Sequence, residues 1–222
     1  MDEFLKKWNI VIKNKKLYET ALSHSSFVNE HNKKQDYERL EFLGDAVLEL
    51  VISDYLYKNV IKKEGEMTKL RASYVCESAL YEYMKKLDLI KYIRVGHGEV
   101  GQIKESIVAD IFESIMAAIY LEEGFLKVKE VILDIIVPYI KDPKVIFFND
   151  YKSSLQEALQ SNKKSFFYET INEEGPAHDK RFTVVVKIDN IIFGKGIARS
   201  KKEAAQLAAK EALTKLAKIE NE

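Results

Sequence analysis

The sequence predicts an all-helical domain followed by a small α+β domain. In residues 1–140 apolar side chains recur at three- and four-residue spacing, and proline is absent before Pro138, as expected for a chain of helices. After about residue 150 the pattern changes to helix, three strands and helix (α-β-β-β-α). The two prolines between Pro138 and Asp150 mark the junction. We therefore expect one domain at residues 1–148 and another at 149–222.

The second domain is predicted element by element. A short helix over 153–160 precedes an aromatic, β-branched strand over 166–171. Residues 182–188 alternate between the two faces expected of a strand. The pair Asp189–Asn190 predicts a tight turn into a third strand at 191–199.

The last strand and helix carry two further local signals. Gly194 and Gly196 inside a strand predict a bulge or a close approach of another backbone. Ser200 and Glu203 have the spacing of a capping box, which begins an alanine-rich helix over 201–217.

Charge and cysteine content limit the protein class only weakly. Basic and acidic residues are equal at 35 each, which does not by itself suggest a nucleic-acid binder. From Asp150 onward there are 13 basic and 11 acidic residues, so the remainder holds 22 and 24. Cys76 is the only cysteine, which excludes an intrachain disulfide. The first ten residues lack a secretory pattern and no apolar run is long enough for a membrane span, so we expect a cytoplasmic protein.

The most informative segment runs from Tyr37 to Leu48. On a helix with about 100° per residue, Glu38, Glu41 and Asp45 fall within an arc of about 60°. Like charges at this spacing repel one another, and this face carries no Lys or Arg. The opposite side is apolar and predicts a core face: Leu40, Leu43, Val47, Leu50 and Val51. The acidic face is either the solvated side of an amphipathic helix or one wall of a cation site.

A second segment, Ile107–Leu121, favours the cation site. Apolar residues surround this predicted helix, so it should be buried, yet it carries Asp110 and Glu113 on one side. Buried carboxylates need a compensating charge, and the nearest cation in the segment is Lys104, before the helix. A divalent ion would compensate both the clustered charge of the first helix and the buried charge of the second. Its ligands would be Glu41, Asp45, Asp110 and Glu113. Oxygen ligands without His or Cys favour Mg²⁺ or Mn²⁺, and therefore phosphoryl transfer.

These segments resemble the ribonuclease III family. Tyr37–Leu48 is similar to the family signature, and Leu17–Glu30 is similar to its early helix and loop. Glu64–Ala72 and Lys104–Gly124 are similar to two later blocks, the second with the D-x-x-E spacing. The tail from Asp150 resembles a double-stranded-RNA-binding domain. The resemblance covers nearly the whole chain in one order.

The resemblance implies roles for individual carboxylates. Glu41, Asp110 and Glu113 match metal ligands, and Asp45 matches a catalytic or ligand carboxylate beside them. Asp45 and Glu113, with Glu38 near the cleavage centre, are the candidate catalytic residues.

Glu64 matches an auxiliary acidic residue that influences a second metal. Two departures concern the loop at 96–104, which has fewer glycines than is usual, and Tyr37, where many members carry Asn.

The predicted last helix begins with two cations. Lys201 and Lys202 oppose the helix dipole, so they are either a solvated pair or, with the helix N-terminus, a phosphate-binding site.

Three further residues are candidates for RNA contact by the resemblance. His178, in a loop between strands, matches a residue that enters an RNA minor groove, although a lone loop histidine commonly has no such role. Gln156 and Glu157 match positions that contact the neighbouring groove, but Gln156 also has capping-box spacing with Ser153. Such domains read the shape and 2′-hydroxyls of A-form RNA.

The sequence therefore predicts a Mg²⁺-dependent endoribonuclease that cuts double-stranded RNA, with Mn²⁺ as a substitute ion. The resemblance further implies a homodimer, with Phe42 off its helix's core face as a dimer contact, and products with 5′-phosphates and short 3′ overhangs. It also implies processing of ribosomal and other structured RNAs. The rivals are a non-catalytic duplex-RNA-binding protein that keeps the nuclease fold as a dimer scaffold, and a metal-binding regulator, which leaves the second domain unexplained.

Overall fold

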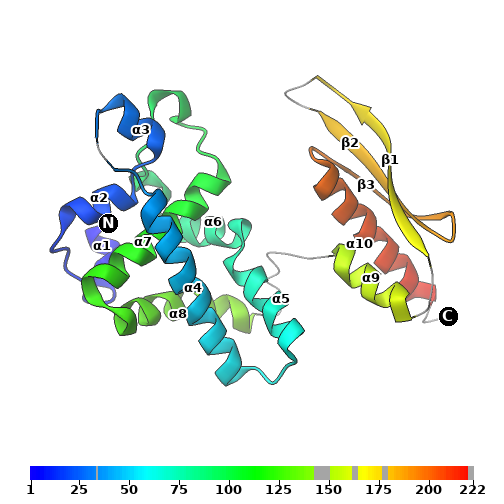
Figure 1. Cartoon of the computed structure of the whole chain (residues 1–222), viewed down its shortest axis with the longest axis horizontal. Helices are drawn as coiled ribbons and strands as arrows, with labels where there is room; N and C mark the ends of the chain where they lie inside the picture. Colours follow the sequence, from blue (N-terminus) through cyan, green and yellow to red (C-terminus); the bar gives the residue numbers. More distant parts are fainter. Residues whose placement is uncertain (34, 143–150, 162–164, 177–179, 220–222) are drawn as a thin grey trace. The chain divides into compact units, whose positions relative to one another are not determined.

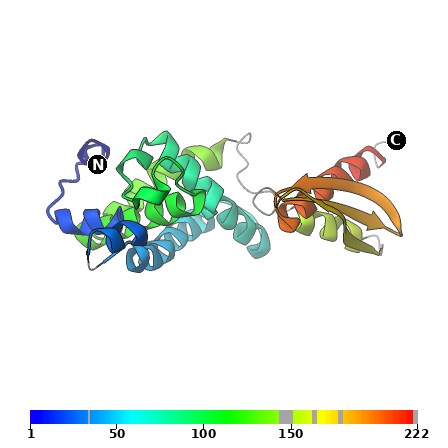
Figure 2. The ribbon, with the colours of Figure 1, turned by 90° about the horizontal axis from the view of Figure 1, so that it is seen from above.

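The computed structural model describes residues 1–33, 35–142, 151–161, 165–176 and 180–219 (Figure 1). The chain divides into two compact units, Met1–Phe148 and Asn149–Glu222. The first unit is helical and the second combines two helices with a three-stranded sheet, as Figures 1 and 2 show. The predicted fold class, an all-α domain followed by a small α+β domain, is confirmed.

The first unit consists of eight α-helices and two short 3₁₀ turns within the described residues. The two 3₁₀ turns, at Ile90–Tyr92 and His97–Glu99, separate the sixth and seventh helices. The α-helices are α1 (Asp2–Lys6), α2 (Lys15–Ala21), α3 (Ser25–Glu30), α4 (Glu38–Asn59), α5 (Glu64–Val75), α6 (Glu77–Lys86), α7 (Glu105–Glu123) and α8 (Phe125–Lys141).

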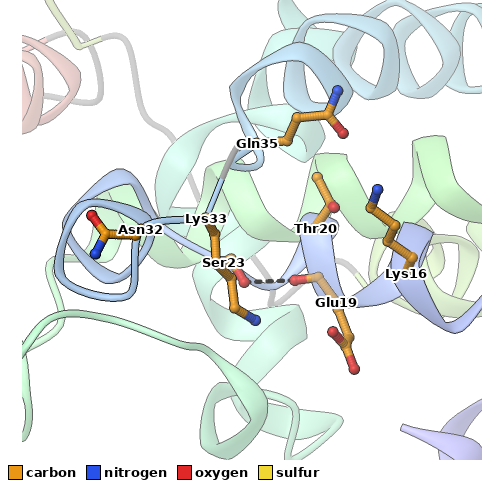
Figure 3. Close-up of a pocket in the computed structure, with 7 residues that line it drawn as sticks. All are labelled: Lys16, Glu19, Thr20, Ser23, Asn32, Lys33 and Gln35. Atoms are coloured by element: carbon orange, nitrogen blue, oxygen red, sulfur yellow. Dashed lines mark hydrogen bonds between the residues drawn. The ribbon is translucent and has the colours of Figure 1, made fainter.

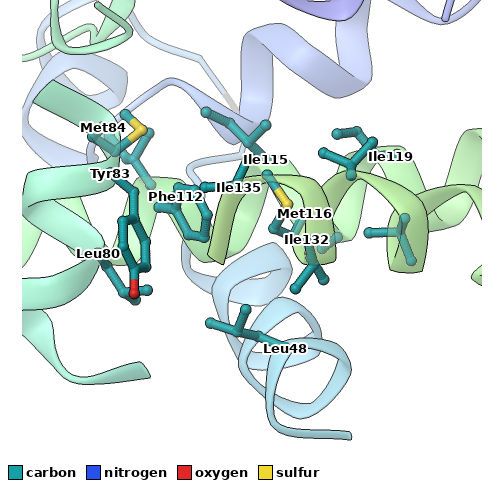
Figure 4. Close-up of a cluster of buried hydrophobic side chains, with 14 of the residues drawn as sticks. Leu48, Leu80, Tyr83, Met84, Phe112, Ile115, Met116, Ile119, Ile132 and Ile135 are labelled. Atoms are coloured by element: carbon teal, nitrogen blue, oxygen red, sulfur yellow. The ribbon is translucent and has the colours of Figure 1, made fainter. Parts of the chain in front are cut away.

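Helix α7 is the centre of the first unit's core. Its side chains are buried nearly all round, as the apolar sequence predicts. Phe112, Ile115 and Met116 meet Leu48 of α4 and Tyr83 of α6 in one continuous cluster (Figure 4). The acidic residues lie on α4 and α7, and both helices pack into this core. Tertiary packing therefore fixes the positions of the carboxylates.

One expectation for α4 is wrong. Leu50 was predicted on the core face but is 57% exposed, whereas Leu40, Val47 and Val51 are buried. Leu50 lies about 60° from Val47 and about 100° from Val51, at the edge of the apolar arc, so periodicity alone does not bury it. Phe42, predicted off the core face, is 81% exposed.

The second unit is a three-stranded antiparallel sheet with two helices. Helix α9 (Tyr151–Ser161) precedes the strands β1 (Phe166–Glu174), β2 (Arg181–Ile188) and β3 (Ile191–Ala198), which pair in sequence order, and α10 (Lys201–Ile219) follows. Both helices lie on one face of the sheet (Figure 2).

The predicted turn and glycine features are present. Asp189 and Asn190 have positive φ angles of 48° and 67°, as a tight hairpin turn requires. At Gly194 and Gly196 an added Cβ would lie 2.0 Å from carbonyl oxygens of α10, so the helix backbone packs directly on β3. The β2–β3 register also shifts between Val186 and Lys187, which is the irregularity the glycines predicted.

The start of α10 agrees with its predicted cap. The backbone N–H of Glu203 donates to Ser200 Oγ at 3.2 Å, which is one half of the capping box. Among the helices of the described residues, none combines the length and apolar character needed to cross a bilayer.

Candidate metal centre and nucleic-acid interface

The acidic site forms where the backbones of α4 and α7 touch. A Cβ added to Gly44 would lie 1.9 Å from the Glu113 carbonyl oxygen, so only glycine permits this approach. Gly44 lies between Glu41 and Asp45 in the sequence, which places the acidic face of α4 beside α7. The charge pattern of the sequence did not draw attention to Gly44. A glycine within an otherwise helical segment nevertheless indicates close packing.

Three carboxylates from these helices converge. Glu41, Asp110 and Glu113 each present an oxygen, and the three oxygens lie within 4.8 Å of one another. All three side chains are partly buried. Within the described residues none of them forms an ion pair with Lys, Arg or His, so the cluster carries uncompensated negative charge. An oxygen-only, anionic donor set of this kind suits a hard divalent cation such as Mg²⁺.

The pKa of Glu113 reflects its burial among other carboxylates. Burial, and then the charges of Asp45, Glu41 and Asp110, raise the pKa of the Glu113 carboxyl to about 8. Burial and the carboxylates of Asp110, Glu38 and Asp45 also raise the pKa of Glu41. A bound cation would reverse both effects by favouring the ionised carboxylates.

The remaining predicted carboxylates lie at different distances from the cluster. Asp45 and Glu38 are exposed and act on it through their charges, but neither belongs to the group of converging oxygens. Glu64 begins α5, accepts a hydrogen bond from the Thr68 hydroxyl at 3.0 Å, and lines a pocket of about 290 Å³. That pocket includes Tyr57, about four turns along α4 from Glu41. Glu64 is therefore not brought into the cluster of its own chain.

Tyr37 is a site residue that the sequence patterns did not identify as functional. It immediately precedes α4, is buried, and its hydroxyl donates to Asp110 Oδ2 at 2.8 Å. Burial, this hydrogen bond and the nearby carboxylates raise the pKa of the Tyr37 hydroxyl, which stays protonated and remains a donor. A tyrosine immediately before an acidic helix was the available signal, but its partner lies 73 residues away.

Pockets elsewhere in the first unit have a different chemistry. One of about 350 Å³ lies beside α2 (Figure 3). There the Ser23 hydroxyl donates to the Glu19 carbonyl at 2.6 Å. None of the clustered carboxylates lines this pocket. Its lining residues are Lys16, Glu19, Thr20, Ser23, Asn32, Lys33 and Gln35.

In the second unit Lys201 and Lys202 lie exposed at the start of α10, as predicted. Lys201 forms an ion pair with Glu173, and Lys180 pairs with the same carboxylate at 2.8 Å. Both lysines also lie 5.4 Å from the centre of the Phe182 ring. Lys201 at the start of α10 and Lys180 just before β2 therefore lie beside one another around Glu173 of β1. The sequence patterns did not identify Lys180 or Glu173.

The structure describes only some of the other residues predicted to contact RNA. Gln156 is exposed on α9. Because α9 begins at Tyr151, Ser153 lies inside the helix and cannot be its N-cap, so the capping alternative for Gln156 is wrong. Glu157 lies in the same helix, with its side chain outside the described part of the structure, and His178 lies outside the described residues.

Comparison with known families gives two matches along the chain. Residues 14–140 match the family model described as Ribonuclease-III-like. Residues 151–216 match the double-stranded RNA binding motif. The two matches follow the two structural units in order.

Curated relatives are similar over almost the full length. The chain is 44% identical to Ribonuclease 3 of Aster yellows witches'-broom phytoplasma, over 96% of this chain and 90% of that protein. It is 46% identical to Ribonuclease 3 of Caldanaerobacter subterraneus, covering 95% of each.

Solved structures agree with the helical unit. A nuclease domain of ribonuclease III from Campylobacter jejuni, described for flexibility in a region of dimer formation, is 38% identical with a TM-score of 0.56. It matches 62% of this chain and 96% of that domain. The chain therefore belongs to the ribonuclease III family of endoribonucleases, with a nuclease domain followed by a double-stranded-RNA-binding domain.

Proposed function

We propose that this protein hydrolyses phosphodiester bonds of double-stranded RNA in a Mg²⁺-dependent reaction, with Mn²⁺ able to replace Mg²⁺. Glu41, Asp110 and Glu113 are the proposed metal ligands. The products carry 5′-phosphate and 3′-hydroxyl ends with short 3′ overhangs. Ribosomal and other structured RNAs in the cytoplasm are the proposed substrates.

The convergence of three carboxylates without a cationic partner carries this proposal. Their oxygens lie within 4.8 Å of one another, and burial makes the ionised form of Glu113 costly. A purely structural cluster would be stabilised by a neighbouring Lys or Arg, and the described residues provide none. This observation favours an enzyme over a scaffold that only binds RNA, because a scaffold gains nothing from the repulsion.

The chain's own residues would divide the chemistry. Glu41, Asp110 and Glu113 would hold the ion, while exposed Asp45 and Glu38 add negative charge near these three carboxylates and are available to orient water. When bound, the ion would lower the pKa of an attacking water and stabilise the negative charge that develops on the phosphate. Asp45 and Glu113 are the carboxylates proposed as catalytic, with Glu38 assisting.

Glu64 is proposed as an auxiliary carboxylate for a second ion. Its place at the start of α5 makes a direct role in the three-carboxylate cluster of the same chain unsuitable.

The second unit is proposed to hold the duplex. Lys201 and Lys202 are exposed in the first turn of α10, the end of the helix whose dipole favours a phosphate. Gln156, Glu157 and His178 are proposed to contact the minor grooves. Contacts of this kind depend on A-form shape, so binding should tolerate changes of sequence.

We further propose a homodimer formed through α4. Phe42, Leu50 and Tyr57 are 81%, 57% and 77% exposed, and they fall within an arc of about 80° on the helix. A row of large apolar side chains on one helix face favours burial against a partner. The Campylobacter jejuni nuclease domain described for dimer formation supports the same state.

Cleavage of three substrates tests the reaction class. The full chain would be incubated with duplex RNA, single-stranded RNA of one of its strands, and duplex DNA of the same sequence, each with Mg²⁺ and with a chelator. We expect cleavage of the duplex RNA alone, and only with Mg²⁺. Binding of duplex RNA without cleavage under any metal condition would support the scaffold alternative instead.

A further inference from the structure

The hydroxyl of Tyr37 is a side-chain donor that reaches the cluster of Glu41, Asp110 and Glu113. It donates to Asp110 Oδ2 at 2.8 Å, and its side chain is only 5% exposed. Within the described residues, no other side chain donates a hydrogen bond to Asp110, Glu41 or Glu113. Tyr37 therefore acts on the cluster from a buried position next to the helix that carries Glu41.

Tyr37 is itself held from three directions. Its backbone N–H donates to the Ser23 carbonyl at 3.0 Å, and its own carbonyl accepts from the N–H of Glu41 at 2.9 Å. Its ring stacks on His24, with centroids 5.8 Å apart. His24 is fixed in turn, because its Nδ1 lies 3.0 Å from a Glu99 carboxylate oxygen. A ring held in this way cannot turn its hydroxyl away from Asp110 without disturbing the start of α4.

We infer that Tyr37 is a positioning residue that orients the Asp110 carboxylate for the divalent cation. Three clustered carboxylates repel one another, and a free Asp110 side chain would rotate away from Glu41 and Glu113. The hydrogen bond to one Asp110 oxygen holds the carboxylate in the orientation that brings the cluster together. Removal of a residue that hydrogen-bonds to a metal ligand typically lowers metal affinity or activity by about 10- to 100-fold.

This inference rests on the proposed metal site, and a matched pair of variants tests it. Tyr37→Phe removes the hydroxyl and keeps the ring. Tyr83→Phe removes another buried hydroxyl, which donates to the Tyr74 carbonyl at 3.1 Å in the core, outside the cluster. Each full-length protein would be titrated with Mg²⁺ in the absence of RNA, with the rise in melting temperature as the signal. Turnover and KM for duplex RNA would then be measured at saturating Mg²⁺.

The two variants should separate positioning from general packing. We expect Tyr37→Phe to raise the Mg²⁺ concentration at half-effect about tenfold, or about 1.4 kcal/mol. Turnover should fall while KM for RNA stays unchanged. Tyr83→Phe should lower the metal-free melting temperature and leave the Mg²⁺ midpoint where it is in the wild type. A Tyr37→Phe protein with the wild-type midpoint and turnover would overturn the inference.

A second pair of substitutions keeps the inference testable if Tyr37→Phe does not fold. Tyr37→Asn supplies a shorter side chain with an N–H donor, and it should retain more Mg²⁺ affinity than Tyr37→Ala if donation to Asp110 matters. Equal midpoints for Tyr37→Asn and Tyr37→Ala would contradict the inference. If wild-type protein shows no Mg²⁺-dependent stabilisation, the metal site itself is wrong and the role of Tyr37 fails with it; a wild-type response with an unaffected Tyr37→Phe refutes the positioning role alone.

Discussion

Glu113 should make the metal-free protein less stable as the pH rises. Burial and neighbouring carboxylates raise the pKa of its carboxyl from 4.5 to about 8 in the folded protein. Between these values the folded chain keeps a proton that the unfolded chain has released, so each increase in pH favours unfolding. The stabilising contribution is complete below about pH 4.5 and is lost by about pH 8. Acidic groups held by cations, such as Glu173, have lowered pKa values and act in the opposite direction.

The size of this effect follows from the pKa. The full difference corresponds to about 5 kcal/mol, and we expect about 2 kcal/mol to be measurable because Glu113 is not completely buried. For a protein of this size that is a fall of about 4–8 °C in melting temperature between pH 5 and pH 8. Glu113→Gln is neutral at every pH, so its melting temperature should fall less over the same range.

The assay combines stability with cleavage. Melting temperatures of wild type and Glu113→Gln would be recorded from pH 5 to pH 8.5 in a chelator, and again with Mg²⁺ at pH 8. Mg²⁺ should restore the stability of the wild type and have little effect on the variant. Duplex-RNA cleavage by Glu113→Gln should fall by orders of magnitude, while duplex binding, measured by gel shift, should persist because Lys201 and Lys202 lie in the other unit.

A matched control distinguishes the cluster from the helix. Glu105→Gln makes the same change at an exposed position in the first turn of α7. It should keep the wild-type pH dependence and wild-type cleavage. If Glu113→Gln instead retains wild-type cleavage, or loses stability with the same pH slope as the wild type, the reasoning about Glu113 is refuted.

Three further predictions concern packing, assembly and RNA binding. Gly44→Ala should destabilise the first unit by about 3 kcal/mol and lower cleavage, since its Cβ meets the Glu113 carbonyl; thermal melting checks this, and an unchanged melting temperature would contradict the close approach. Phe42→Asp should give a monomer by analytical ultracentrifugation at micromolar concentration, whereas a dimer as tight as the wild type would remove α4 from the interface. Changing Lys201 and Lys202 to Ala should weaken duplex binding and reduce its salt dependence by about two charges, and an unchanged salt slope would exclude both as phosphate contacts.

Local periodicity was sufficient for much of the fold. The 3.6-residue repeat placed Glu38 on the face of α4 opposite Val47, and alternation gave β2 its bounds to within one residue. The Asp189–Asn190 turn followed from residue types that adopt positive φ. These features depend on neighbours in the sequence, so the sequence alone specifies them.

Features that depend on distant partners were less accessible. The charge pattern suggested four metal-site carboxylates, but tertiary packing brings three together and leaves Asp45 exposed beside them. Tyr37 looked like a departure from the usual asparagine, and only the approach of α7 reveals its bond to Asp110. Leu50 was assigned to the core although it is exposed, because helix periodicity does not show how much of the apolar arc the neighbouring elements cover.

Affinity cleavage by iron tests most directly whether α4 and α7 form one cation site. Fe²⁺ would replace Mg²⁺ in the full-length protein, and ascorbate with peroxide would generate radicals that cut the backbone near the bound ion. The account predicts cuts near Glu41 and near Asp110–Glu113, segments about 70 residues apart that meet only through the fold, and their suppression by excess Mg²⁺ and by Glu113→Gln. Cuts confined to other segments, or unaffected by Mg²⁺, would contradict the proposed metal centre.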